Sequence, residues 1–271
     1  MTDNRFTARR ALWLRQQQRQ RRRIRAWQLG LLLALFGLWE LTTALGLVDG
    51  FVISSPSRML TSFLSLCRGG SLLEHIGISC LETVLGFLAG TLLGCAVAVA
   101  MWWWEGLARV LSPYLVVLNA LPKTALGPIF IVWMGAGMGA IIVMTLAISL
   151  IVTILNMYQG FLGTDAEKLR LMRSLGASRW QILWLLVFPA SCPTLFATLK
   201  VNVGLSWVGV IMGEFLVSRA GLGYLIVYGS QVFNMDLVMC SVLLLAVAAV
   251  LMYRLVLLCE KKLQHDWGIQ T

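Results

Sequence analysis

Six stretches of about 20 mostly apolar residues alternate with short polar segments along the chain. They cover residues 27–47, 81–103, 110–134, 139–158, 194–216 and 237–258. An α-helix needs about 20 apolar residues to cross a bilayer core about 30 Å thick. The third and fourth stretches share a charge-free run of 41 residues, 124–164, which is too long for one helix, and Gly135, Gly137 and Gly139 offer a break. The pattern predicts an all-α integral membrane protein with about six transmembrane helices.

Composition supports this prediction. Hydrophobic residues make up 59% of the 271 residues, and only 13% are charged, against about 25% in soluble proteins. These values exclude a soluble enzyme and a disordered chain. Apolar and polar residues do not alternate over ten-residue segments, so an outer-membrane barrel is also disfavoured.

The basic residues indicate how the helices are oriented. The net charge is +10, and nine arginines fall within residues 5–25. Short cytoplasmic segments retain Lys and Arg, and an inside amino terminus puts 17 basic residues on the cytoplasmic side and three outside. We therefore expect both termini to be cytoplasmic. Residues 1–26 form a basic cytoplasmic segment that orients the chain and contacts anionic lipid, an interpretation favoured over nucleic-acid binding, and residues 27–271 form the transmembrane domain.

The cytoplasmic loop 159–193 carries more structure than a simple connection needs. Asp165 and Glu167 suit the start of a short helix, Arg170 and Arg173 suit its later turns, and Gly176 suits a left-handed stop. Ala177 and Ser178 then lead into a second helix, which Pro189 interrupts. Two interpretations are open: an interfacial segment that anchors the chain, or a rigid knob for a soluble partner.

Polar and special residues also interrupt the third apolar stretch. Pro122 removes a backbone hydrogen bond and should kink or break the helix. Asn119 and Lys123 flank it, and an ionisable residue inside a span is a candidate for lining a transport pathway. The alternative is that Lys123 lies near an interface and extends its ammonium group to lipid headgroups.

The external side offers two further features. Ser55 and Pro56 predict the start of a short helix within residues 48–79. Glu214, near the outer end of the fifth stretch, begins a loop that runs to Gly221 and Gly223. We expect Glu214 to pair with Arg219 or to anchor this loop, with a contact to an external partner as the alternative. In the second stretch, Gly86, Gly90 and Gly94 are spaced for close helix approach.

The cytoplasmic loop resembles a known signature. Residues 175–178 (LGAS), Leu186 and Phe188-Pro189 are similar to the loop of ATP-binding-cassette (ABC) importer permeases, in which Glu-Ala-Ala is followed after three residues by Gly and later by Leu-Pro. Gly176 and Pro189 keep the spacing. Arg170, Leu171 and Met172 stand where the family has Glu-Ala-Ala, which replaces a negative contact with a positive one.

Three other stretches resemble the nitrate/sulfonate/taurine subfamily, which also includes permeases for thiamine precursors. They are 54–58 (SSPSR), 118–135 with its LNALPKTA segment, and Glu214 followed by 221–226 (GLGYLI). The resemblance covers the chain from about residue 54 to 258, with a core permease region at about 76–258.

The resemblance implies a type I ABC importer permease fold in the inner membrane of a bacterial-type cell. It also implies a translocation pathway between two permease copies, with a homodimer expected, a cytoplasmic ATPase dimer and an external solute-binding protein. We expect no catalytic residue, metal site or bound cofactor in this chain, because ATP and Mg would bind the ATPase. The implied substrate is a small anion such as an aliphatic sulfonate, taurine or nitrate, with a thiamine-precursor pyrimidine as the alternative.

Two other classes of function remain as alternatives. An ATP-independent secondary transporter would predict inverted repeats or several paired intramembrane charges, which the sequence does not display. A membrane anchor or assembly subunit would leave the broken third stretch and the glycine-stopped cytoplasmic helix without a purpose.

Overall fold

The computed structural model describes residues 3–266, and these residues form helices joined by short turns. The chain divides into two compact units, residues 1–64 and 65–271. The prediction of an all-helical membrane protein is confirmed: within residues 3–266, five helices are long and apolar enough to cross a bilayer, and the number is six if one bent helix pair counts as a span.

The first unit contains α1 (Asp3–Ala44), α2 (Gly50–Ile53) and most of α3 (Pro56–Arg68). The apolar part of α1, Arg22–Ala44, is long enough to cross the membrane. Near its end, the Glu40 carboxylate accepts hydrogen bonds from the Ser57 backbone N–H at 3.0 Å and hydroxyl at 2.7 Å. Asp49 caps α2 through the Phe51 N–H at 2.8 Å. The predicted short helix after Ser55 is confirmed as α3.

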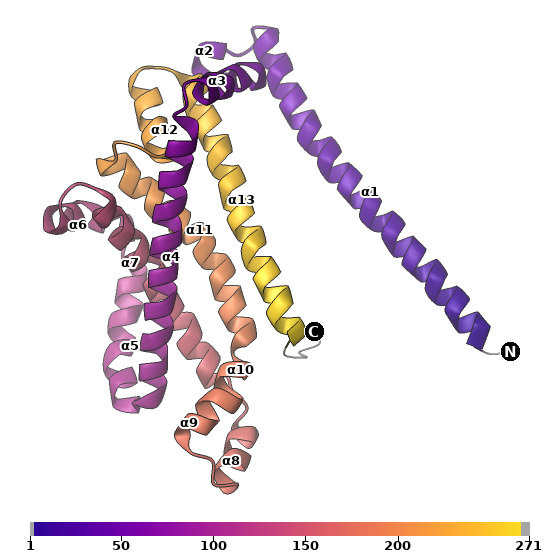
Figure 1. Cartoon of the computed structure of the whole chain (residues 1–271), viewed down its shortest axis with the longest axis vertical. Coiled ribbons are helices and arrows are strands. Elements are labelled where there is room, and N and C mark those ends of the chain that lie inside the picture. Colours follow the sequence, from indigo (N-terminus) through magenta and orange to yellow (C-terminus); the bar gives the residue numbers. More distant parts are fainter. Residues whose placement is uncertain (1–2, 267–271) are drawn as a thin grey trace. The chain divides into compact units, whose positions relative to one another are not determined.

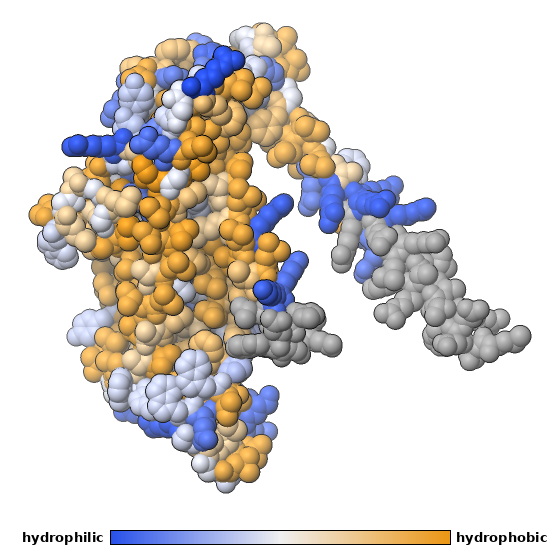
Figure 2. All heavy atoms as spheres, viewed as in Figure 1, coloured by the Kyte–Doolittle hydropathy of each residue, from blue (hydrophilic) through white to orange (hydrophobic). Residues whose placement is uncertain are grey.

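The second unit is a bundle built around long helices (Figure 1). Its helices are α4 (Leu72–Trp103), α5 (Glu105–Ala120), the 3-10 turn η1 (Lys123–Leu126), α6 (Gly127–Met134), α7 (Met138–Leu162), α8 (Ala166–Ser174), α9 (Arg179–Ile182), the π-helical turn η2 (Leu183–Val187), α10 (Phe188–Ala190), α11 (Cys192–Val217), α12 (Leu222–Gln231) and α13 (Met235–Asp266). The segment α8–α10 lies at one end of this bundle and α12 at the other. Hydrophobic residues dominate the middle of the unit, and hydrophilic residues gather at its two ends (Figure 2).

Two predicted spans differ from the helices observed. Helix α4 begins at Leu72, well before the predicted start at residue 81, because it continues through the polar residues Glu74 and His75, which apolar counting excludes. The third predicted span, 110–134, is broken as Pro122 predicted: α5 and the η1–α6 segment meet at 93°.

A seam of small residues joins α4 to α7. A β-carbon placed at Gly86 would lie 2.5 Å from the Thr145 methyl carbon, and one at Gly94 would lie 2.5 Å from the Thr153 β-carbon. Between them, a β-carbon at Gly90 would overlap the Ser149 hydroxyl. The predicted close approach of the glycine-bearing helix is confirmed, and α7 supplies the facing side chains at the same four-residue spacing.

Helix α7 also packs against α11 on another of its faces. A β-carbon at Gly209 would lie 2.8 Å from the Thr145 α-carbon, so the two backbones nearly touch. The buried Asn202 amide donates to Thr153 Oγ1 at 2.7 Å. Thr145 and Thr153 each donate to the carbonyl four residues earlier, as hydroxyls do in apolar helices. Helix α7 is therefore the centre of the bundle.

Helices α11 and α13 are joined by an ion pair. Lys200 Nζ lies 2.7 Å from Glu260 Oε2, and both side chains are mostly buried. Lys200 lies near the end of its apolar stretch, where a lysine side chain could extend to the lipid headgroups. It instead pairs with the carboxylate of Glu260 on the neighbouring helix.

We expect the glycine seam to be intolerant of a single added methyl group. Gly90→Ala should destabilise the purified chain by about 1–3 kcal/mol, because overpacking displaces α4 from α7. Gly77→Ala, on the same helix with open space around it, should leave the thermal unfolding midpoint unchanged or raise it. Adding Ser149→Ala to Gly90→Ala should restore part of the loss, and a Gly90→Ala midpoint equal to that of Gly77→Ala would contradict the seam.

Candidate functional site

Helix α8 is defined at both ends by its own sequence. The Asp165 carboxylate accepts from the Glu167 N–H at 2.9 Å and caps the first turn. At the other end, Gly176 has a φ of +77°, and the Gly176 and Ala177 N–H groups donate to the carbonyls of Arg173 and Met172, each at 3.0 Å. This is a glycine-stopped helix end, as the sequence predicts.

The next helix, α9, begins three residues after this stop. Ser178 and Gln181 form a capping box, in which the Gln181 side chain accepts from the Ser178 N–H at 2.8 Å and the Ser178 hydroxyl accepts from the Gln181 N–H at 3.3 Å. This reciprocal pairing satisfies two otherwise free N–H groups. The chain between α8 and α9 therefore has one defined path.

Pro189 disturbs the helix without ending it. It has no N–H to donate to the Leu185 carbonyl, and the preceding turn, η2 (Leu183–Val187), is π-helical. Helix α10 and then α11 follow, so the predicted break before the fifth span is a wider turn and not a loop.

The segment α9–η2 is fastened to the membrane-spanning helices by apolar packing. Ile182, Leu183 and Val187 are at most 4% exposed and pack with Ala98 of α4 and with Phe161 of α7. Aromatic rings continue this contact: the Trp103 and Trp180 centroids are 5.2 Å apart, and Trp180 stacks on Trp184. The α8–α10 segment is therefore seated on the ends of α4 and α7.

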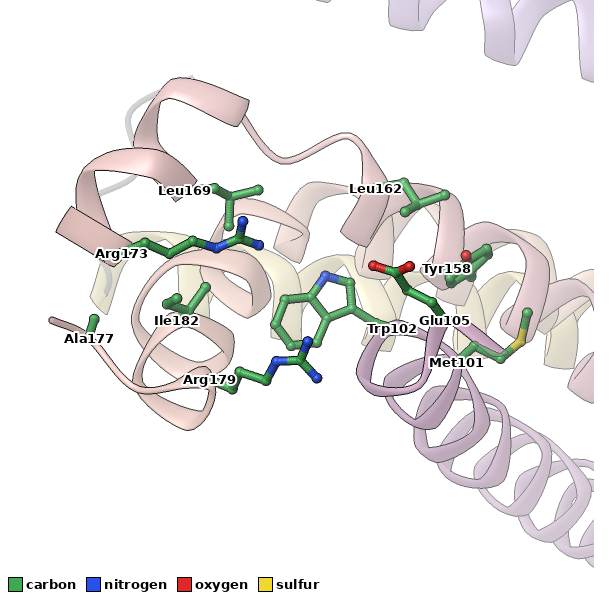
Figure 3. A pocket seen from close by; sticks show the side chains of 10 residues that line it. All are labelled: Met101, Trp102, Glu105, Tyr158, Leu162, Leu169, Arg173, Ala177, Arg179 and Ile182. Atoms are coloured by element: carbon green, nitrogen blue, oxygen red, sulfur yellow. The ribbon is translucent and has the colours of Figure 1, made fainter. Parts of the chain in front are cut away.

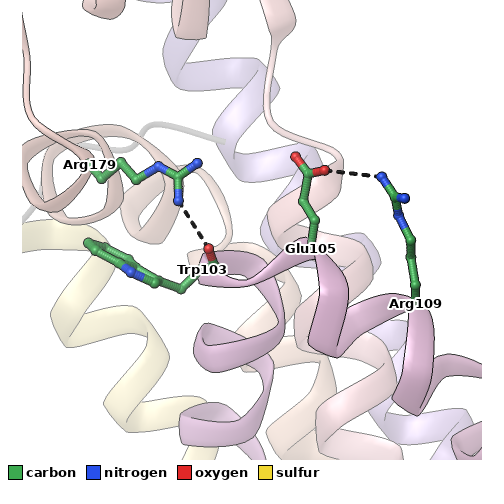
Figure 4. Close-up of polar contacts among 4 residues, drawn as sticks. All are labelled: Trp103, Glu105, Arg109 and Arg179. Carbon is green, nitrogen blue, oxygen red and sulfur yellow. Dashed lines mark hydrogen bonds and ion pairs between the residues drawn. The ribbon is translucent and has the colours of Figure 1, made fainter.

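A hydrogen bond reinforces this seat (Figure 4). Arg179 Nη1 donates to the Trp103 carbonyl at 3.2 Å. Trp103 is the last residue of α4, so its carbonyl lacks a partner within the helix. The neighbouring Glu105 pairs with Arg109 at 3.4 Å, and both of these side chains are exposed.

The outer face of α8 is basic and apolar. Lys168 and Arg170 are exposed, as are Leu171 (59%) and Leu175 (73%). Arg173 is also exposed, but it extends toward the bundle. Met172 turns inward and packs with the α9–η2 core. Of the three residues in the Glu-Ala-Ala positions, Arg170 and Leu171 therefore face outward and Met172 faces the bundle.

A cavity of about 500 Å³ lies between part of α8 and α9 and the ends of α4 and α7 (Figure 3). Met101, Trp102, Tyr158 and Ile182 are among its lining residues. The guanidinium groups of Arg173 and Arg179 extend toward the Trp102 ring. Helix α8 is thus supported from one side by α9–η2, with open space beneath its Arg173 side.

The break between α5 and α6 brings the other predicted residues together. Pro122 follows Leu121 in extended conformation. Lys123 folds back so that its Nζ donates to the Asn119 carbonyl at 3.0 Å and to the Asn119 side chain at 3.3 Å. The ammonium group therefore satisfies a carbonyl at the C-terminal end of α5 and complements the helix dipole there.

Glu214 is buried and not part of an exposed loop. It lies within α11 and is 2% exposed. Its carboxylate accepts from the Ser79 hydroxyl and from the backbone N–H groups of Gly223 and Tyr224. Of the two expected roles, the pairing with Arg219 is wrong and the anchoring role is what the structure supports, because the side chain points to the start of α12 and holds it.

All four N–H groups at the start of α12 are satisfied by side chains. Gly221 donates to His75 Nδ1 at 3.0 Å and Leu222 to Ser79 Oγ at 2.7 Å, while Gly223 and Tyr224 donate to Glu214. The first N–H groups of a helix have no partner within it, and burial without one costs about 1–3 kcal/mol each. We call His75, Ser79 and Glu214 the α12 seat.

The seat explains the two glycines of the external motif. Gly221 has a φ of +125°, and a β-carbon there would overlap the Glu214 carboxyl group. A β-carbon at Gly223 would lie 2.8 Å from Glu214 Oε2. Both glycines are needed because the carboxylate reaches the backbone directly.

His75, Ser79 and Glu82 are the site residues that the sequence does not single out. They occur at helical spacing on α4, and Ser79 and Glu82 are fully buried. Three polar residues on one face at the start of an apolar helix were the available signal. The role of this polar face becomes clear only when the structure places Glu214, which is distant in sequence, beside it.

Residues 86–265 match the family described as binding-protein-dependent transport system inner membrane component. The chain is 28% identical over 239 residues to SsuC of Bacillus subtilis, named as an aliphatic sulfonates transport permease, covering 88% of this chain and 87% of that protein. It is 25% identical to the taurine transport permease TauC of Escherichia coli, covering 83% of each. It is 26% identical to the formylaminopyrimidine transport permease ThiX of Halalkalibacterium halodurans, covering 71% of this chain and 76% of that protein.

The fold is shared with solved transporters. An inward-facing structure of the MetNI methionine ABC transporter superposes with a TM-score of 0.63 at 19% identity, covering 70% of this chain and 95% of that one. The similarity confirms the type I importer permease fold. With the family match covering more than half of its length, this chain belongs to the binding-protein-dependent transport system inner membrane components and is a permease subunit of an ABC importer.

Proposed function

We propose that this permease pairs with a second copy of itself to form a translocation pathway, and that α8 is the helix that a cytoplasmic ATPase engages. The observation that carries the proposal is the outer face of α8, where Lys168, Arg170, Leu171 and Leu175 are exposed on a segment held rigidly by Ile182 and its neighbours. A face that is both basic and apolar suits a protein partner with acidic and apolar side chains.

Movement of the ATPase would reach the bundle through the packing of the α8–α10 segment against α4 and α7. Asp165, Glu167, Gly176, Ala177, Ser178 and Pro189 shape the segment, and its buried side chains rest on α4 and α7. ATP binding and a loaded external binding protein would each favour one of two conformations through different affinities for them. ATP and Mg would bind the ATPase, and this chain would bind neither.

We further propose a small anion as the substrate, such as an aliphatic sulfonate, taurine or nitrate. The names of the sulfonate and taurine relatives support this class. Asn119, Pro122 and Lys123 would contribute to the pathway, where the ammonium group favours negative charge. The second candidate is a thiamine-precursor pyrimidine, favoured by the formylaminopyrimidine relative.

Gly176 offers a test of coupling. Gly176→Val should lower ATP-driven uptake at least about tenfold, because a β-branched residue at φ of +77° is strained and would shift α8. Gly176→Asn, which tolerates this conformation, should retain most of the uptake. The measurement is substrate uptake per mole of complex in proteoliposomes with the ATPase and binding protein. Equal uptake by the two variants would remove α8 from the coupling step.

The charge of α8 offers a test of the partner. Lys168→Glu with Arg170→Glu should reduce the ATPase that co-purifies with the permease about tenfold, because like charges would then meet across the contact. Arg109→Gln, an exposed position outside the segment, serves as the control. Retention of the ATPase by the double variant at the control level would contradict the docking surface.

Lys123 offers a test of the pathway. Lys123→Met should reduce uptake of an anionic substrate about tenfold or more, while Lys123→Arg should keep a substantial part of it, because the charge is preserved. The alternative role, a cap on the Asn119 carbonyl, predicts a lower unfolding midpoint and unchanged uptake per folded complex. Uptake of sulfonate, nitrate and a pyrimidine should be compared in the same vesicles, since loss confined to the anions identifies the substrate class.

A further inference from the structure

Two buried carboxyl groups meet beside the α12 seat. Glu82 of α4 is 1% exposed and Glu214 of α11 is 2% exposed. Ser79, three residues before Glu82 on the same face of α4, donates to Glu214 Oε1, which places Glu82 beside Glu214, and a side-chain hydrogen bond links the two carboxyl groups. Neither forms an ion pair with a Lys or Arg of the described residues. Nothing in the proposed transport function accounts for this pair.

The other contacts of the two groups differ. Glu214 accepts from the Ser79 hydroxyl and from the Gly223 and Tyr224 N–H groups, which is the environment of an ionised carboxylate. One oxygen of Glu82, Oε2, is buried and has no hydrogen-bond partner. An unpaired oxygen is far less costly as the carbonyl of a neutral acid than as part of a buried carboxylate.

A hydrogen bond between two carboxyl groups also requires a proton, because carboxylates are acceptors only. We infer that Glu82 and Glu214 form a single-proton site, in which neutral Glu82 donates to ionised Glu214. Glu82 is then a positioning residue: its donated hydrogen bond holds the Glu214 carboxylate against the start of α12.

The groups around the pair do not offer another positive charge that could neutralise the two carboxyl groups in place of this proton. His75 Nδ1 accepts from the Gly221 N–H, so its imidazole is neutral, because an imidazolium has no acceptor nitrogen. Cys80 on α4 and Tyr224 on α12 are uncharged in their ordinary forms. Helix α7 carries no charged residue, and α13 contributes an acid, Asp236, at its start. Among the described residues, no group of three His, Cys, Asp or Glu is placed to hold a metal ion.

Infrared spectroscopy tests the proton directly. The full chain, purified and returned to lipid bilayers at neutral pH, should show the C=O stretch of a protonated carboxylic acid. Glu82→Gln should remove this band, because the amide replaces the acid as the donor and leaves Glu214 ionised. Glu74→Gln, an exposed carboxyl on the same helix, should leave the band in place. A wild-type spectrum that equals the Glu82→Gln spectrum in this region would overturn the single-proton site.

A comparison of two uncharged replacements tests the positioning role. Glu82→Gln keeps a donor for Glu214, and its thermal unfolding midpoint should stay within a few degrees of wild type. Glu82→Met has similar bulk and no donor, so its midpoint should be clearly lower, and the amides at the start of α12 should exchange with deuterium at least about tenfold faster. Equal midpoints and exchange rates for the two variants would overturn the donor assignment.

A wild-type unfolding midpoint that depends on added Na⁺ or Ca²⁺ would indicate a cation between the two carboxylates and would overturn the single-proton site. None of these readouts requires transport, so they stand apart from the proposed substrate and partner.

Discussion

Polar backbone groups inside a bilayer must find partners within the protein, because no water is available to them. An unbroken helix meets this demand alone, but this permease breaks its helices at Pro122 and Gly221. At Gly221 the seat residues His75, Ser79 and Glu214 accept hydrogen bonds from the four N–H groups at the start of α12, which have no partner within that helix. At Pro122 a side chain covers a free carbonyl of α5. Irregular backbone is therefore present where another segment completes its hydrogen bonds.

Helix α4 connects the two ends of the second unit. At one end it provides Ser79 and Glu82 beside the start of α12, and at the other its last carbonyl accepts from Arg179 of α9. Between these ends its glycines hold it against α7 without room for a methyl group. A displacement of α8 and α9 would thus reach α12 through one rigid helix whose sliding is resisted by the Gly90–Ser149 contact.

Local signals predicted the local structure well. Asp165, Gly176 and Pro122 act through their own backbones or neighbours, so the cap, the helix stop and the break could be inferred from the sequence. The partners of Glu214 could not, because Ser79 lies 135 residues away in the chain and only packing of α4 beside α11 brings them together. Nearby Arg219 offered a plausible partner by sequence distance. The donors that Glu214 meets are instead the Ser79 hydroxyl and the N–H groups of Gly223 and Tyr224, and these favour the carboxylate at the start of α12.

The same reasoning explains where this chain departs from the family pattern. Arg170 and Leu171 replace Glu and Ala on an exposed face. In the proposed docking these side chains would contact the ATPase, and a matching change in that partner would restore the fit. Gly221 cannot change in this way, because the carboxylate of Glu214 occupies the space beside it and both belong to one chain. Under the proposed docking, variation on α8 would therefore adjust which ATPase is accepted, whereas the α12 seat is constrained by the need to pair every buried N–H group.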